Sequence, residues 1–324
     1  MCTAISLTTQ DHYFGRNLDL EYSYLETITI TPRNFPFEFR HKETIRHHYA
    51  IIGTAYVQNN YPLYYDATNE KGLSMAGLNF PENAHYFSFM DHKDNITPYE
   101  FIPWVLGQCT SVEDAHVLLE HLNLFEHPFS KKLPLSPLHW LISDKYSSIV
   151  VESCKDGLHV HDNPVGVLTN NPPFELQLFY LNNYMHLSTT SPQNHFAENL
   201  NLQIYSNGMG GIGLPGDWSS QSRFVRASFA KTNSKCGKLE MENVTQFFHL
   251  LNSVEFPRGC VKMKNNIYEI TVYSSCCNTD KGIYYYKTYE NSTINAVCMH
   301  HENLDGNQLI CYPMKKETQI YLQN

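Results

Sequence analysis

The order in which strand-like and helix-like segments follow one another most constrains the fold of this chain. Short runs rich in β-branched and aromatic residues predict strands in the first third, and the alternation is clearest in the stretch ETITIT. Helical patterns come next, followed by strands, helices and strands again. Because runs of strands and runs of helices take turns, the order argues against a doubly wound βαβ fold. It predicts an α+β arrangement of largely antiparallel sheets with helices packed outside.

The individual elements can be located approximately. The predicted helices cover residues 98–108, 111–122, 174–185, 222–232 and 244–254. The first of them is expected to start at Pro98, because Thr97 and Glu100 have the spacing of a capping box. The turn sequence NEKG at 69–72 predicts a hairpin between its flanking strands. The predicted strands are residues 3–7, 12–20, 26–32, 47–57, 63–68, 73–80, 138–144, 147–153, 157–162, 165–171, 267–275, 282–289 and 293–300.

Composition and charge narrow the class of protein. The formal net charge of −9 argues against nucleic-acid binding, which favours a basic face. The longest apolar stretch, Tyr49 to Val57, is too short to cross a bilayer, and the first residues do not resemble a secretory signal. Nine cysteines, an odd number spread along the chain, do not form the framework of a small secreted domain. No internal repeat or linker interrupts the sequence. We therefore expect one cytoplasmic domain over residues 1–324, with reduced thiols.

Two motifs suggest cofactors and are set aside. The stretch GMGGIG at 208–213 matches a dinucleotide fingerprint, but Pro215 and Gly216 follow where a helix would have to begin. It is better interpreted as a turning loop. Neighbouring histidines of a strand point to opposite faces, and His159 with His161 lacks an evident third ligand. The sequence predicts no metal site and no cofactor.

A cysteine stands directly after the initiator methionine. If Met1 is removed, the α-amino group of Cys2 can accept the proton of its own thiol, since their ordinary pKa values lie close together. Such a nucleophile needs a carboxylate, a cation and oxyanion donors nearby. Arg16 and Asp19 in FGRNLD offer the two charges, although taken alone they favour a surface ion pair at a hairpin end. Asparagines in AGLNFP and VLTNNP could be the donors or ordinary turn residues.

Several short segments occur together in one order, namely MCT, FGRNLD, NEKGLSMAGLNFP, LHWLISD, VGVLTNNP, GLPGDWSSQSRF and KGIYYYKTY. As a set they closely resemble the choloylglycine hydrolase family, over essentially the whole chain. The resemblance implies an N-terminal-nucleophile hydrolase fold, a four-layer αββα sandwich of two antiparallel sheets flanked by helices. It implies Cys2 as nucleophile after loss of Met1, Arg16 beside the thiolate and Asp19 holding the amine. Asn79 and Asn170 would supply oxyanion donors and Arg223 a supporting charge, with Asn171 as the alternative to Asn170.

The resemblance also narrows the substrate to a conjugated bile salt or penicillin V. Asn79 favours the bile salt, because penicillin acylases of the family tend to have tyrosine there. Apolar residues that could line the mouth of the site, or simply form an ordinary rim, are Leu18, Tyr24, Tyr65, Phe129 and Leu133. We therefore expect an amidase that releases glycine or taurine from bile salts; the choice between the two amino acids stays open. The alternatives are another N-acyl amide, such as an acyl-homoserine lactone, and a catalytically idle binder of amphipathic ligands. The family resemblance implies a homotetramer.

Overall fold

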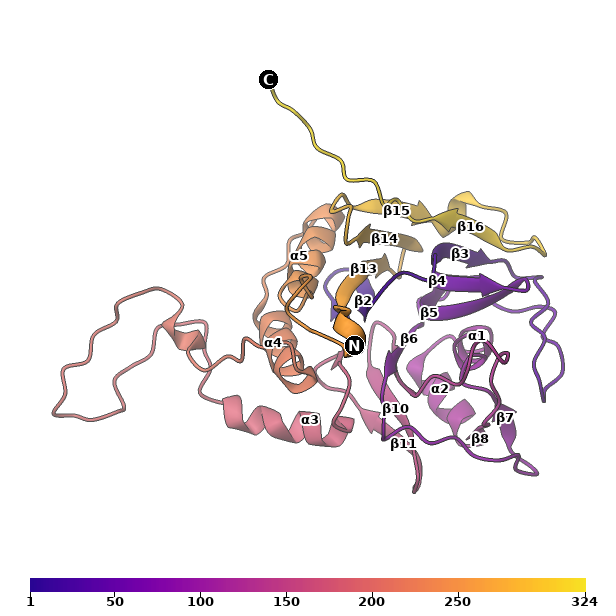
Figure 1. Ribbon diagram of the computed structural model, residues 1–324, viewed down its shortest axis with the longest axis horizontal. Coiled ribbons are helices and arrows are strands. Elements are labelled where there is room, and N and C mark those ends of the chain that lie inside the picture. The colour runs from indigo at the N-terminus through magenta and orange to yellow at the C-terminus, as the bar shows by residue number, and fades with distance from the viewer.

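Two antiparallel sheets lie face to face, and helices cover their outer faces (Figure 1). This arrangement is seen in a computed structural model that describes residues 1–324, apart from the side chain of Asn265. The order of layers is helix, sheet, sheet, helix, so the predicted αββα sandwich is confirmed. Among the described residues, no helix is both long enough and apolar enough to cross a lipid bilayer.

The strands divide between two main sheets and one small parallel pair. The six-stranded sheet contains, in spatial order, β12 (Val167–Leu168), β1 (Cys2–Thr8), β2 (His12–Leu20), β13 (Ile270–Asn278), β14 (Ile283–Thr288) and β15 (Asn295–Cys298). The eight-stranded sheet contains β11 (Gly157–Asp162), β10 (Ser148–Cys154), β9 (Leu138–Ser143), β6 (Ser74–Asn79), β5 (Tyr61–Asn69), β4 (Ile51–Gln58), β3 (Thr27–Thr31) and β16 (Ile310–Pro313). The parallel pair is β7 (Asp94–Ile96) with β8 (Leu122–Leu124).

The described residues form five α-helices, which lie outside the sheets. Helices α4 (Ser220–Asn233) and α5 (Glu240–Asn252) pack on the six-stranded sheet, and α1 (Phe101–Leu106) packs on the eight-stranded sheet. Helix α2 (Val112–Leu119) shares the hydrophobic core of α1, and α3 (Phe174–Tyr180) follows β12. Beyond α3 the chain forms a long projecting loop before it returns to α4 (Figure 1).

Inner strands of the eight-stranded sheet such as β6, β9 and β10 are buried on both faces, which explains their long apolar runs. In β4, Ile52 faces the core between the two sheets, whereas its neighbour Ile51 faces the core under α1 and α2. Successive residues of a strand point to opposite faces, so one strand serves both cores. The two sheets are thereby held at fixed positions, with β1 and β2 lying against β5 and β6.

Some predicted element boundaries were wrong. The first helix begins at Phe101, not Pro98, because Glu100 turns its carboxylate back onto the Thr97 backbone N–H (3.0 Å) and the intervening residues form a turn. The strand expected at 165–171 is reduced to β12, since side-chain hydrogen bonds hold the backbone that follows it. The strand expected at 293–300 ends at Cys298 in a 3-10 turn. Strands β7, β8 and β16 are too short to show a period in the sequence.

Candidate active site

Cys2 begins β1 in the interior of the protein, with 3% of its surface exposed. In the antiparallel pairing of β1 with β2, Cys2 lies opposite Leu18 and Ala4 lies opposite Arg16. A hairpin therefore brings the nucleophile candidate next to the strand that carries both Arg16 and Asp19. The surface ion pair considered as an alternative is excluded, because Arg16 and Asp19 are both fully buried.

Arg16 extends from β2 across to the facing sheet. Its Nη1 donates to the backbone oxygens of Tyr65 (2.9 Å) and Gly77 (2.6 Å), while Nη2 is buried and has no hydrogen-bond partner in the described part of the chain. Burial acts to lower the pKa of the guanidinium, but the negative charges that Cys2, Tyr273 and Asp66 can carry outweigh it and raise that pKa. Arg16 is therefore a permanent cation within the electrostatic field of Cys2.

Asp19 lies at the end of β2, close to the start of the chain. Its Oδ1 accepts a hydrogen bond from the Thr271 hydroxyl (2.6 Å), and Oδ2 has no partner among the described residues. Its backbone N–H donates to the Met1 carbonyl (2.9 Å), and the Met1 amine contacts the Asp19 carbonyl (2.6 Å) and the Glu269 carboxylate. Burial raises the pKa of Asp19, and the nearby chain terminus opposes that rise. The carboxylate and the terminal amine thus influence each other's charge.

Asn170 and Arg223 complete the surroundings of Cys2. The Cys2 backbone N–H donates to Asn170 Oδ1 (2.9 Å), and the same oxygen accepts from Arg223 Nη2 (2.7 Å). Arg223 Nη1 donates to the Cys2 carbonyl (2.5 Å) and the Thr3 hydroxyl (2.6 Å). Burial lowers the pKa of Arg223 to about 10, so this residue remains a cation at neutral pH.

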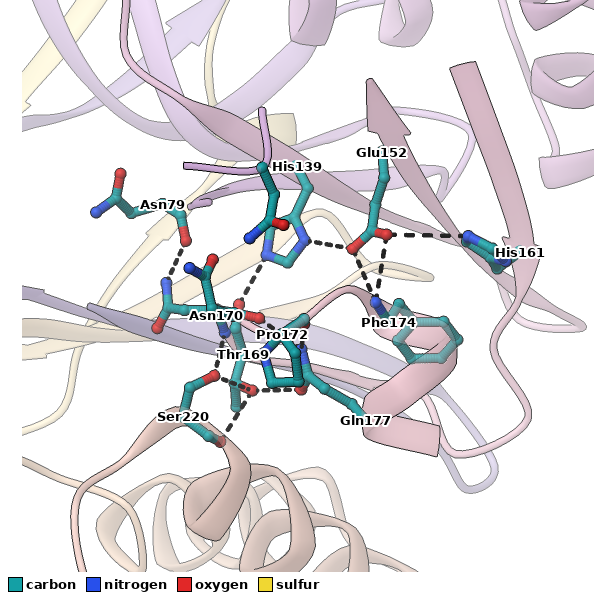
Figure 2. Close-up of polar contacts among 12 residues, drawn as sticks. Asn79, His139, Glu152, His161, Thr169, Asn170, Pro172, Phe174, Gln177 and Ser220 are labelled. Carbon is teal, nitrogen blue, oxygen red and sulfur yellow. Dashed lines mark hydrogen bonds and ion pairs between the residues drawn. The ribbon is translucent and has the colours of Figure 1, made fainter. Parts of the chain in front are cut away.

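Asn79 at the end of β6 and Asn170 in the turn after β12 lie next to each other, although these two strands belong to different sheets (Figure 2). The Asn170 side-chain nitrogen donates to the Asn79 backbone oxygen (2.6 Å). That NH₂ group carries a second hydrogen, which is free to bind a developing oxyanion. Asn171 instead donates from its side chain to the Pro81 carbonyl (2.8 Å), away from Cys2. Of the two adjacent asparagines, Asn170 is thus the one in contact with Cys2.

Comparisons with known proteins agree with this geometry. Residues 2–312 match the model of the linear amide C–N hydrolases, choloylglycine hydrolase family. The chain belongs to the choloylglycine hydrolase family. It is 56% identical, over the full length of both chains, to a bile salt hydrolase/transferase from Lactiplantibacillus plantarum. The solved structure of the C2A mutant of the conjugated bile acid hydrolase from Clostridium perfringens is 40% identical and superposes with a TM-score of 0.93 over all of both chains.

A more distant likeness supports the fold alone. The penicillin V acylase from Agrobacterium tumefaciens is 17% identical and has a TM-score of 0.76, with 98% of this chain and 94% of that chain covered. The layers of the choloylglycine hydrolase fold therefore persist where few residues are shared.

The five residues expected to line the mouth lie in different surroundings. Leu18 is buried opposite Cys2, and Tyr65 is joined to the site through the bond from Arg16 to its carbonyl. Tyr24 is partly exposed and packs against Tyr22 with the rings tilted, at a centroid distance of 4.9 Å. The remaining two, Phe129 and Leu133, lie on the segment between β8 and β9, where Phe129 packs on Tyr61 and Tyr99. The structure brings Leu18 and Tyr65 to the Cys2 cluster, and no contact among the described residues joins Phe129 or Leu133 to it.

Sequence reasoning missed several polar residues that this choloylglycine hydrolase buries around the site. Asp66 accepts from the Tyr273 hydroxyl (2.5 Å), from Ser275 (3.1 Å) and from the Tyr284 hydroxyl (2.5 Å), and it contributes to the field on Arg16. An aspartate within the apolar run LYYDAT was the available signal, because an unpaired acid is rarely buried. Ser220, Gln177 and Glu269 carried no comparable signal.

The motifs set aside in the sequence do not join the Cys2 cluster, although His161 approaches the buried Glu152 carboxylate at 3.9 Å (Figure 2). Gly208 and Gly213 have positive φ values of 83° and 97°, and the chain between them forms a 3-10 turn. The fingerprint is therefore a turning loop, as predicted. His159 pairs with Asp156 (2.9 Å) at the surface, and the described residues contain no group of three or more His, Cys, Asp or Glu able to hold a metal ion.

Proposed function

We propose that this protein hydrolyses the amide bond of glycine- and taurine-conjugated bile salts. The observation that carries the proposal is the convergence on Cys2 of two buried arginines, a buried aspartate and an asparagine amide. Relatives that match the whole chain at 56% and 40% identity are named for hydrolysis of bile salts or conjugated bile acids. No cofactor enters the reaction.

Maturation removes Met1 before catalysis, and this converts the Cys2 backbone N–H into a free amine. The amine accepts the thiol proton, Asp19 holds the amine, and Arg16 favours the thiolate. The thiolate attacks the amide carbon, and the oxyanion receives the free hydrogen of the Asn170 side-chain nitrogen, with Asn79 as the second donor. Arg223 fixes Asn170 through the shared Oδ1 atom.

The second half of the reaction regenerates the thiol. The protonated amine gives its proton to the leaving nitrogen, so that glycine or taurine departs and a thioester of the bile acid remains on Cys2. Water then loses a proton to the same amine and attacks the thioester, releasing the free acid. One group thus serves as base and acid in turn.

In this proposal, contacts between the protein and the steroid part of the substrate determine which amide is cleaved. Leu18 lies opposite Cys2 in the β1–β2 pairing and is expected to contact the steroid, with Tyr24, Tyr65, Phe129 and Leu133 as further candidate contacts. A rigid steroid buries a large apolar area, at roughly 25 cal/mol for each Å² removed from water. Penicillin V offers a smaller apolar group and is expected to be the poorer substrate.

A release assay with purified protein tests the proposal. Glycocholate and taurocholate should be cleaved about tenfold or more faster than penicillin V, because hydrophobic fit discriminates on that scale. The amines are quantified by chromatography, and the intact mass should lack Met1. Faster cleavage of penicillin V would reverse the assignment of substrate. A fully active preparation that retains Met1 would refute the mechanism.

Amide synthesis is a second candidate activity, and the same thioester supports it. The 56% identical relative is named a hydrolase/transferase, and an amine that reaches the thioester before water would form a new amide. We expect glycocholate incubated with excess taurine to yield taurocholate as well as cholate. Mass spectrometry measures both products. The Cys2→Ala variant is the control and should form neither taurocholate nor cholate.

We also propose that the protein is a cytoplasmic homo-oligomer, the tetramer that its family resemblance implies. All nine cysteines are free thiols, as suits a reducing compartment. Residues 185–208, here called the arm, project from the layers beyond α3 (Figure 1). Exposed apolar side chains are unusually frequent on the arm. They are Met185, Phe196, Leu200, Leu202, Ile204 and Tyr205.

Replacing apolar side chains of the arm should weaken assembly. Phe196 and Tyr205 are each 82% exposed, so the double change to serine removes apolar surface without opening a core. Light scattering after gel filtration should report a smaller particle for this variant. Tyr146→Ser is the matched control, because Tyr146 is 91% exposed outside the arm. A monomeric wild-type protein would contradict the proposal.

A further inference from the structure

A histidine and a glutamate are buried together behind the turn that carries Asn170 (Figure 2). His139 of β9 and Glu152 of β10 are 0% and 1% exposed, and the distance between His139 Nδ1 and Glu152 Oε1 is 2.9 Å. The mechanism described above uses neither residue. A buried titratable pair with no assigned task, adjacent to the candidate active site, requires an explanation.

The partners of the pair determine where its protons lie. His139 Nε2 is 2.9 Å from the Thr169 carbonyl oxygen, which can only accept, so Nε2 carries a hydrogen. Both Glu152 oxygens accept from the Phe174 backbone N–H, at 3.0 and 3.2 Å. One further proton lies between Nδ1 and Oε1. Whether this proton resides on His139 or on Glu152, His139 still donates to the Thr169 carbonyl and Glu152 still accepts from the Phe174 N–H.

The pair therefore holds both ends of the segment 169–174. Within the segment, the Gln177 side-chain nitrogen donates to the carbonyls of Asn170 (2.5 Å) and Pro172 (2.7 Å). The Asn170 backbone N–H donates to the Ser220 hydroxyl (2.8 Å). With His139 and Glu152 at its two ends, the backbone that carries the Asn170 amide has little freedom to move.

The same histidine contacts the other proposed oxyanion donor. The ring of Phe80, the residue after Asn79, stacks on the His139 ring at a centroid distance of 4.2 Å and an angle of 5°. Phe80 itself is fully buried. His139 thus supports the strand end of Asn79 through ring stacking and the turn of Asn170 through a hydrogen bond.

We propose that His139 and Glu152 are positioning residues for the oxyanion side of the active site. They set the separation between the Asn170 side-chain nitrogen and the reacting carbonyl, whereas the pairing of β1 with β2 and the bond from Arg223 to the Cys2 carbonyl hold the Cys2 backbone. The inference rests on the proposed amide hydrolysis. If the inference is correct, variants of the pair should lose turnover while the Cys2 thiol keeps its reactivity.

The test compares three variants of the pair in the release assay. His139→Phe keeps an aromatic ring but cannot donate to Thr169, and a displacement of about 1 Å in Asn170 should lower kcat about 10²-fold with KM nearly unchanged. His139→Gln retains a donor and should recover part of that loss. Glu152→Gln removes the carboxylate at constant size and should also lower kcat. Alkylation of Cys2 by iodoacetamide should proceed at the wild-type rate in all three, because it needs no oxyanion donor.

His48 provides a matched control. It is 4% exposed and, like His139, has both ring nitrogens bound, to the carbonyls of Tyr49 (2.7 Å) and Phe35 (2.9 Å). His48→Phe should lower the melting temperature as His139→Phe does, yet leave kcat unchanged. An equal loss of kcat in the His48 variant, or slowed alkylation of Cys2 in parallel with kcat, would show a general structural role and overturn the proposal.

Two further outcomes are decisive. If His139→Phe does not fold, Glu152→Gln and His139→Gln decide, and wild-type kcat in both overturns the proposal. If the wild-type protein cleaves no amide at all, the proposed function fails and the positioning role fails with it. If the wild-type protein cleaves bile salts and the variants retain its full kcat, only the positioning role is refuted.

Discussion

Replacing Cys2 by alanine should abolish bile salt hydrolysis, with a fall in kcat of about 10⁴-fold or more. The alanine keeps the α-amino group and the strand β1 pairing but removes the only atom placed to form the thioester. Because Cys2 is buried and small, the cavity created is slight and the protein should still fold. The measurement is release of glycine from glycocholate at saturating substrate.

Ligand binding separates loss of chemistry from loss of structure in this variant. The Cys2→Ala protein should still be stabilised against heat by glycocholate, as expected when the substrate contacts Leu18 and Tyr65 rather than sulfur. Binding without turnover in the wild-type protein as well would favour the catalytically idle binder. Turnover retained by the alanine variant would refute Cys2 as nucleophile.

Replacing Asn170 by aspartate should lower kcat by about 10²–10³-fold, the cost of one oxyanion donor. Aspartate keeps an oxygen for the Cys2 backbone nitrogen and for Arg223, so it removes mainly the donating NH₂ group. The variant is measured in the release assay, with kcat and KM determined separately. A loss confined to KM would mean that Asn170 binds substrate without stabilising the oxyanion.

The neighbouring asparagine supplies the control for this experiment. Asn171→Asp makes the same chemical change one residue later, where the side chain points to Pro81. Its kcat should stay within about threefold of the wild-type value, as for a surface change away from the chemistry. Similar losses in both variants would show that added charge in this turn, and not a missing donor, slows the reaction.

Local sequence patterns predicted those turns and strands whose conformation depends mainly on their own residues. The NEKG turn gave the β5–β6 hairpin, with Gly72 at a φ of 91° as such a turn requires. The helix start at Phe101 was missed because the Glu100 side chain can cap a turn as readily as a helix. Strand β16 pairs with β3 across almost the whole chain, and four residues carry no period that would reveal it.

Some residues of the candidate active site could likewise be predicted from local sequence, and others could not. Arg16 and Asp19 lie on the strand paired with Cys2, so an antiparallel hairpin would place them near it. Asn170 follows β12, and Arg223 lies on α4. Residue type alone made Asn170 one of three candidate donors, whereas only the family resemblance linked Arg223 to Cys2. The supporting pair His139 and Glu152 could not be predicted, because each residue alone is typical of a strand facing solvent.

The two chain ends differ in what can be attached to them. Met1 is enclosed by Asp19, Glu269 and Arg223, whereas the last residues extend away from the layers and Ile320, Tyr321 and Leu322 are each more than three-quarters exposed (Figure 1). A purification tag fused ahead of Cys2 would keep the Cys2 nitrogen in a peptide bond, so the amine that the proposed mechanism uses as a base could not form. The carboxyl end is the place for a tag, a fluorophore or a surface linker.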